Sequence, residues 1–119
     1  MKFQTSELVA YARAAGCLEG DPGIRSPDYM AKDFLGPVLR FALLSGLPWV
    51  MKWSYEKIVP GVYLYHLARV RAFDNILSDE LSRGIKQVVV LGAGLDSRPY
   101  RFADRLSGVR VFEVDHPIT

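Results

Sequence analysis

A glycine-rich segment, Leu91-Gly92-Ala93-Gly94, is the part of the sequence best suited to hold a ligand. It directly follows residues 87–91, a short apolar and β-branched run that is typical of a strand in a parallel sheet. Glycine lets the backbone turn sharply and leaves no side chain between the main chain and a ligand. Ligands of open α/β sheets bind beyond the carboxyl ends of the strands, where this segment is expected. Taken alone, the segment equally suits a plain strand-to-helix turn.

Acidic residues at the end of the next apolar run sharpen this interpretation. Asp115 lies 21 residues beyond Gly94, and an acid at about that distance can accept hydrogen bonds from ribose hydroxyls. Glu113 points the same way by the alternation of a strand, so we expect it at the same pocket. The alternative is that both carboxylates merely cap a strand end. A dinucleotide site would need a third glycine at position 97, where this chain has Ser97, so a nucleoside is favoured over a pyrophosphate.

The residue spacing gives little support for a metal site or for nucleophilic catalysis. His66 and His116 have no cysteine or carboxylate partner at metal-ligand spacing, so we predict no metal. No Ser/His/Asp arrangement stands out either, and the sequence alone identifies no catalytic residue. Aromatic residues upstream of the glycine segment could line an acceptor site, but aromatic residues more often belong to a core or an interface. These residues are Trp49, Trp53, Tyr63 and Tyr65.

The elements that must position the glycine segment follow the order helix, strand, glycine loop, helix, strand. A 3.6-residue pattern predicts a long helix at 63–83, and buried strands are expected at 87–91 and 110–114. Pro99 is a good first-turn residue for a short helix that ends near 106. This order opens a doubly wound α/β sheet. On the long helix, the charged residues expected on the face away from the core are Asp74, Asp79, Glu80 and Arg83.

The first half of the chain predicts short helices. Thr5 or Ser6 is expected to cap the first of them. Residues 26–28 are expected to open the second, with Ser26 as the cap, proline in the first turn and Asp28 at the positive helix end. A third helix follows. Glycine and proline residues delimit the three helices: Gly16, Gly36-Pro37, Gly46 and Pro48.

The amino-acid composition and charge argue against several classes of protein. A chain of 119 residues, half of them hydrophobic, supports one modest domain. Its 15 Lys and Arg against 13 Asp and Glu are scattered, so we expect no nucleic-acid partner. Cys17 is the only cysteine, which fits a reducing compartment and predicts a cytoplasmic protein. The most apolar window, 34–50, is interrupted by Arg40 and by prolines, so no membrane span is predicted.

Several runs resemble the leucine carboxyl methyltransferase family, and in particular its bacterial S-adenosylmethionine-dependent members. The runs are VVVLGAGLDSRPYRF (88–102), FEVDHP (112–117), ARVRAFD (68–74) and, more loosely, RSPDYMAKDF (25–34). The similarity therefore spans roughly residues 25–117, and 92–101 is its most distinctive part.

The resemblance implies a site for S-adenosyl-L-methionine. Arg69 matches the family arginine that holds the carboxylate of the cofactor's methionine moiety, a role that suits the planar fork of a guanidinium. Gly92 matches the backbone contact beneath the cofactor, and Asp115 matches the ribose-binding acid. Asp96 is expected to hydrogen-bond loop amides. The family also has a lysine near its N-terminal helix, but the register of Lys32 does not match it. The predicted cofactor-binding residues are Arg69, Gly92, Ala93, Gly94, Asp96, Glu113 and Asp115.

The implied fold is α/β, the N-terminal part of a Rossmann-like class I methyltransferase preceded by a helical extension. We expect the extension at 1–59 and the first part of the S-adenosylmethionine-binding domain at 60–119. Because ordinary sheets carry about 5–6 strands, two strands lead us to expect a truncated chain.

The expected reaction is methyl transfer to an oxygen nucleophile of a small-molecule or carboxylate acceptor. An ionised carboxylate needs no general base, so alignment would supply most of the catalysis. The main alternative is a non-catalytic remnant that binds a protein partner through the apolar region 34–53, which also predicts a homo-oligomer. A nicotinamide-dependent enzyme is a third possibility, but it would require the missing third glycine.

Overall fold

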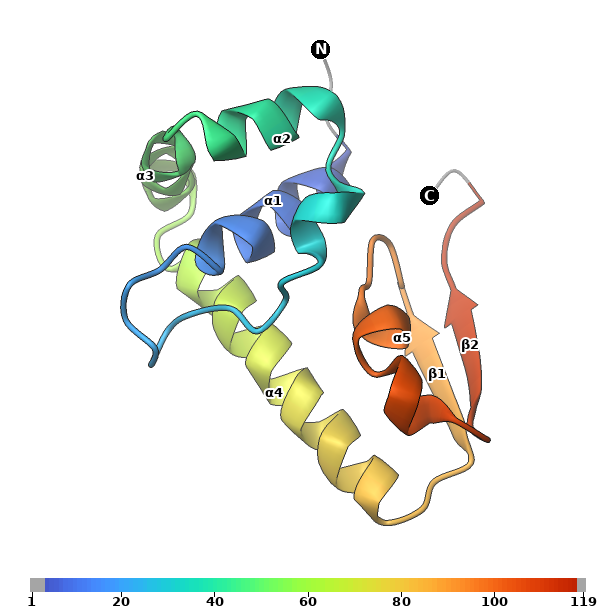
Figure 1. The fold of residues 1–119 in the computed structure, drawn as a ribbon. Coiled ribbons are helices and arrows are strands. Elements are labelled where there is room, and N and C mark those ends of the chain that lie inside the picture. The colour runs from blue at the N-terminus through green and yellow to red at the C-terminus, as the bar shows by residue number, and fades with distance from the viewer. Residues whose placement is uncertain (1–3, 118–119) are drawn as a thin grey trace.

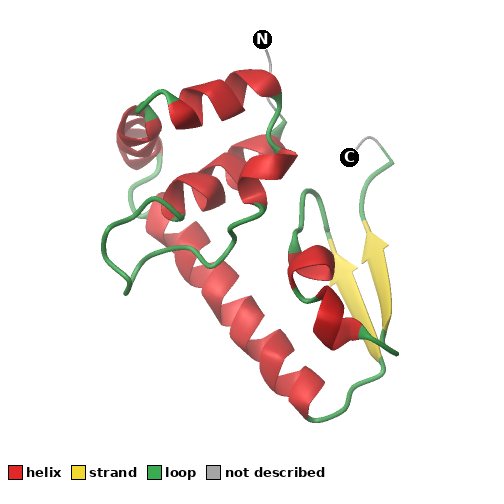
Figure 2. Ribbon diagram, in the orientation of Figure 1, coloured by secondary structure: helices red, strands yellow, loops and turns green. Residues whose placement is uncertain are grey.

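The computed structural model describes residues 4–117 and places a group of helices beside a pair of parallel strands (Figures 1 and 2). The chain is therefore of mixed α/β type, as expected. In chain order the elements are α1 (Thr5–Gly16), the 3₁₀ helix η1 (Ala31–Phe34), α2 (Pro37–Leu44), α3 (Pro48–Ile58), α4 (Val62–Ser82), β1 (Gln87–Leu91), α5 (Arg98–Arg101), the 3₁₀ helix η2 (Ala103–Leu106) and β2 (Arg110–Val114).

Helix α1 forms the centre of the core. The expected caps Thr5 and Ser6 lie inside the helix; Gln4 is the N-cap instead, and its backbone N–H donates to the Glu7 carboxylate at 3.1 Å. Alanines on α1 are buried and let neighbouring helices approach closely. At Gly16, where the helix ends as predicted, an added Cβ would lie 2.2 Å from a methyl carbon of Leu67 on α4. The helix end thus requires glycine for packing.

The segment between α1 and α2 differs from the prediction. Residues 26–30 form turns rather than a helix, and only the single 3₁₀ turn η1 follows. The Ser26 hydroxyl still accepts a hydrogen bond from the backbone N–H of Asp28 at 3.2 Å, as in a local turn. The Asp28 side chain is fully buried and pairs with distant arginines, and these contacts outweigh the local preference for a helix.

Prolines open both of the next two helices. Pro37 begins α2 as predicted, whereas Pro48 begins α3 and does not merely close the preceding helix. Proline suits the first helical turn because its missing N–H would have no partner there. Large apolar side chains of this region are exposed: Phe41, Leu44, Trp49 and Trp53.

Helix α4 is the longest element and runs diagonally along the molecule (Figure 1). It begins at Val62 and ends close to the predicted position, just before Gly84, whose φ of +85° favours glycine. Its buried stripe follows helical spacing: Tyr63, Leu67, Val70 and Asp74. The prediction that Asp74 faces away from the core was wrong.

Strands β1 and β2 pair in parallel, in a register that sets Val89 beside Phe112 and Leu91 beside Val114. Helices α5 and η2 form the crossover between the strands and lie over one face of the pair (Figure 2). The prediction of strands buried on both faces was wrong: Leu91 is 77% exposed and Val89 is 56% exposed. None of residues 4–117 covers the face of the strand pair that carries Val89 and Leu91.

Two further findings concern the described part of the chain. None of its helices is both long enough and apolar enough to cross a membrane. Between residues 4 and 117, no three His, Cys, Asp or Glu side chains gather in a way that could hold a metal ion.

Candidate functional site

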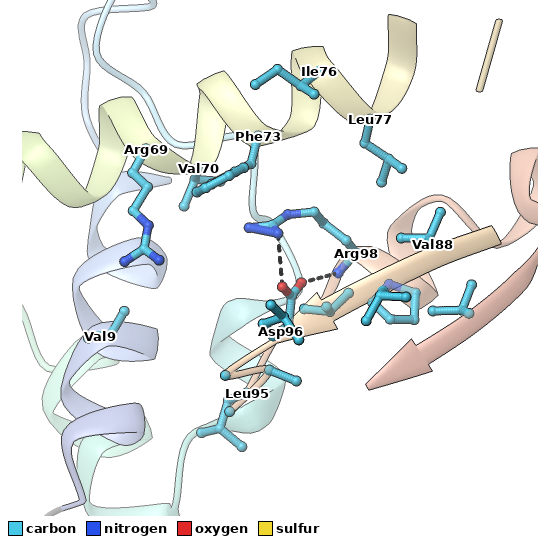
Figure 3. A pocket seen from close by; sticks show the side chains of 18 of the residues that line it. Val9, Arg69, Val70, Phe73, Ile76, Leu77, Val88, Leu95, Asp96 and Arg98 are labelled. Carbon is cyan, nitrogen blue, oxygen red and sulfur yellow. Dashed lines mark hydrogen bonds and ion pairs between the residues drawn. The ribbon is translucent and has the colours of Figure 1, made fainter. Parts of the chain in front are cut away.

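A cavity of about 670 Å³ separates α4 from β1 and reaches α1 at one end (Figure 3). Its size lies in the usual range for small-molecule sites. One end is apolar: Leu77 on α4 faces Val88 on β1, and Ile76 is also among its lining residues. The other end, beside the carboxyl end of β1, is polar and contains the glycine loop and Arg69. A ligand with an apolar ring and a charged tail suits such a cavity.

The glycine loop has the open geometry that its sequence predicts. Gly92 and Gly94 adopt positive φ angles of 62° and 51°, which favour glycine. The backbone N–H groups of Gly92 and Ala93 both donate to the carbonyl of Val114, at 2.7 and 3.3 Å. A Cβ at Gly92 would meet no atom within 4 Å, so the space above this residue is open to a ligand.

Asp115, at the end of β2, is hydrogen-bonded to the glycine loop. One of its carboxylate oxygens accepts a hydrogen bond from the backbone N–H of Gly94, and the other accepts one from His116 at 2.7 Å. The two features that sequence spacing linked, the loop and the acid, are thus in direct contact.

Arg69 lines the polar end of the cavity from α4 (Figure 3). Its guanidinium carbon lies 5.5 Å from the centre of the Phe73 ring. Within residues 4–117 the guanidinium makes no hydrogen bond and no ion pair. A guanidinium over a ring keeps its N–H edges available, and those edges match a carboxylate.

The other predicted site residues differ in their positions. Asp96 lines the cavity, but its carboxylate accepts hydrogen bonds from the backbone N–H and the guanidinium of Arg98, at 2.8 and 2.9 Å. The first of these bonds comes from a loop amide, which is the kind of contact expected of Asp96. Ala93 also lines the cavity. Glu113 is exposed and is absent from the cavity wall, so its predicted role finds no support in the geometry.

Beside the loop lies a buried chain of alternating charges that sequence reasoning missed. The Arg13 guanidinium lies 2.9 Å from Asp28, and Arg101 lies 3.3 Å from the same aspartate. Arg101 also makes a two-pronged pair with Asp74 at 2.5 and 2.9 Å. Arg98 joins the Asp74 carboxylate to Asp96. In order, the buried charge chain consists of Arg13, Asp28, Arg101, Asp74, Arg98 and Asp96.

The charge chain joins three segments that lie far apart in the sequence. They are 25–34, 68–74 and 92–101, each of which lies within a run that resembles the methyltransferase family, and the charge chain connects them to Arg13 on α1, outside those runs. That coincidence was the available clue, because no local pattern links them. Burial lowers the pKa of Arg13, with the charge of Asp28 opposing the shift. Burial also disfavours charge on Arg101, yet the hydrogen bond and charge of Asp74 leave its pKa raised.

His66 lies one helical turn before Arg69 and lines the same cavity. Burial, followed by the positive charges of Arg69 and Arg13, lowers its pKa below the ordinary 6.5. The folded protein therefore favours the neutral imidazole. Stability that depends on this preference is present above the unfolded pKa and is lost as the pH falls through the folded pKa.

We therefore expect the free energy of unfolding to fall less steeply between about pH 7 and pH 5 in His66→Gln than in the original chain. Urea titrations at several pH values, followed by circular dichroism, measure this difference. The carboxylates titrate alike in His66→Gln and in the original chain, so their contribution to the pH dependence of stability cancels in the comparison. Identical pH slopes would contradict the prediction.

Fold and site together define an α/β protein with a ligand cavity at the carboxyl end of a parallel strand pair. The model of the family described as leucine carboxyl methyltransferase matches residues 6–119. The chain belongs to this family, which confirms the resemblance found in its sequence.

Relatives in mycobacteria and in Bacillus subtilis carry the name "Putative S-adenosyl-L-methionine-dependent methyltransferase". One from Mycolicibacterium smegmatis is 36% identical over 92% of this chain and 35% of its own length. One from Mycobacterium avium is 48% identical over 95% of this chain and 36% of its own length. The chain thus spans about a third of the length of these curated relatives. No solved structure matches it.

Proposed function

We propose that this chain binds S-adenosyl-L-methionine at the polar end of the cavity. Arg69 would hold the carboxylate of the methionine moiety, the 92–94 backbone would lie beneath the nucleoside, and Asp115 would accept hydrogen bonds from the ribose. The observation that supports the proposal is the Arg69 guanidinium, which has no hydrogen-bond or ion-pair partner among residues 4–117 and lies on the wall that also contains the glycine loop.

The residues present fit this cofactor in three respects. The Arg69 edges match a carboxylate, and the open space above Gly92 admits a ring without a side-chain clash. Asp115 is directed toward the loop by its hydrogen bond with the Gly94 N–H, and a carboxylate is an acceptor that suits ribose hydroxyls. Asp96, by contrast, is occupied by Arg98, and we propose that it supports the loop and does not touch the cofactor.

We further propose that the whole protein is a methyltransferase acting on an oxygen nucleophile, with a carboxylate as the favoured acceptor. The bound cofactor would supply an electrophilic methyl group on its sulfonium. An acceptor carboxylate is already ionised at neutral pH, so this chain needs to bind and align rather than move a proton. No acid–base pair is required of the residues that line the cavity.

We propose that β1 and β2 are opening strands of a Rossmann-like sheet, because parallel strands joined by a helical crossover are typical of it. Residues 1–59 and 60–119 remain the proposed division into a helical extension and the start of the cofactor domain. The single cysteine supports a reducing, cytoplasmic environment. Self-association through 34–53 is supported by the exposed Phe41 and Trp49 side chains.

Calorimetric titration with S-adenosylhomocysteine tests the binding proposal. We expect saturable one-site binding, and at least about tenfold weaker binding by Asp115→Ala, since a hydrogen bond to a charged group contributes about 1.5–3 kcal/mol. NADH serves as the comparison ligand and should bind neither protein. Absence of heat at millimolar S-adenosylhomocysteine, with protein that is folded by circular dichroism, would overturn the proposal.

A further inference from the structure

We propose that Arg13 and Asp28 are positioning residues, through which the N-terminal helical segment sets the conformation of the glycine loop. The inference rests on the proposed function, because the loop is the predicted cofactor contact. The buried charge chain would then position the glycine loop as well as stabilise the fold.

Both residues contact the loop through side-chain hydrogen bonds. The Arg13 guanidinium donates to the backbone carbonyl of Leu95 at 2.6 Å, immediately after Gly94. Asp28 accepts a hydrogen bond from the Ser97 hydroxyl at 2.5 Å. Both contacts bridge long stretches of sequence, 82 residues in the first case and 69 in the second. The far side of the loop is therefore held from the N-terminal segment.

The near side of the loop is held from β2. Val114 accepts the N–H groups of Gly92 and Ala93, and Asp115 accepts that of Gly94. The loop thus lies between two anchors, one at the strand end and one at Arg13 and Asp28. Glycine loops are flexible when unsupported, because glycine populates both signs of φ. Fixing the amides in one arrangement before ligand binding lowers the entropic cost of binding.

Burial and charge favour a positioning role over a purely stabilising one. The Asp28 side chain is inaccessible to solvent, and that of Arg13 is 9% exposed. Desolvating two charges costs about as much as their attraction returns, so a buried pair is weak support for stability. What such a pair does provide is a fixed geometry, since an ill-placed buried charge is expensive. The geometry fixed here is that of residues 95–97.

Arginine is specifically suited to this position. One guanidinium nitrogen of Arg13 contacts Asp28 while another donates to the Leu95 carbonyl. A lysine keeps the charge but cannot direct two nitrogens along fixed and different lines. Arg13→Lys therefore preserves charge and most of the volume while removing the rigid link.

The test compares Arg13→Lys and Asp28→Asn with Arg25→Lys in the 119-residue chain. Arg25 is the matched control, because it also donates to backbone carbonyls, those of Glu19 and Gly20, yet lies outside the charge chain. Amide hydrogen exchange by NMR, without ligand, compares residues 92–94 with α2. Calorimetry then measures S-adenosylhomocysteine affinity at a temperature where every variant is folded.

We expect exchange at 92–94 to become at least about tenfold faster in Arg13→Lys, with α2 unchanged and affinity about tenfold weaker. Asp28→Asn should act in the same direction, and Arg25→Lys should do neither. Unchanged loop exchange, or equal acceleration in the loop and α2, would overturn the inference. If the original chain does not bind the ligand, the proposed function fails while loop exchange still decides the positioning role.

Discussion

We expect Arg101→Met to lower the free energy of unfolding by about 3–5 kcal/mol, because it removes one positive charge from the buried charge chain and leaves a net negative charge there uncompensated. The Arg101 side chain is only 6% exposed. It pairs with Asp74 through two nitrogens and lies 3.3 Å from the fully buried Asp28. Methionine fills a similar volume but offers neither aspartate a donor. Urea denaturation followed by circular dichroism measures the change.

Arg105→Met is the matched control for this prediction. Arg105 comes one turn later and also reaches α4, where it donates to Ser78 and Ser82. Its side chain is exposed, so its loss should change stability by no more than about 0.5 kcal/mol. Equal losses for the two variants would show that the buried charge chain contributes no more than a surface contact.

Much of the fold was predictable because its periodicity is local. Helix α4 and both strands begin and end within a residue or so of their predicted positions. Glycine at the end of α4 and proline at the starts of α2 and α3 reflect constraints that act within one turn. Such local constraints can be predicted from the sequence.

The errors arose where distant contacts override local preference. Residues 26–28 have a good helix start, yet Asp28 is drawn into the core by Arg13 and Arg101, and a turn results. Asp74 lies among charged residues of α4, and only its pairing with Arg101 explains its burial. No periodicity in a single sequence reveals a partner 27 residues away.

In the candidate site, too, the spacing along the chain was predictable and the contacts between distant residues were not. The spacing of Gly94 and Asp115 predicted two features of one pocket, and the two groups are hydrogen-bonded. Period-2 alternation also placed Glu113 there, but side-chain direction along a strand does not define a cavity wall. Arg13 escaped prediction because an arginine on a helix is ordinarily a solvated one.

We expect Arg69→Met to weaken S-adenosylhomocysteine binding about 10- to 100-fold, since charge-assisted hydrogen bonds contribute about 1.5–3 kcal/mol. Arg69 has no ion pair with the described residues, so its removal leaves no buried carboxylate unpaired. Stability should therefore change little. Arg69→Lys should fall between, because it retains charge without the planar fork. Calorimetric titration gives the three affinities.

Two controls separate recognition of the carboxylate from a general effect on the cavity. Arg83→Met removes an exposed arginine at the end of α4 that pairs with Glu80, and this variant should bind like the original chain. The ligand 5′-methylthioadenosine keeps the nucleoside but lacks the amino-acid tail, so its affinity should not depend on Arg69. Equal weakening of both ligands in Arg69→Met would place the fault in the cavity wall around Phe73. Unchanged affinity for both would remove Arg69 from the site and leave the loop and Asp115 to hold the cofactor.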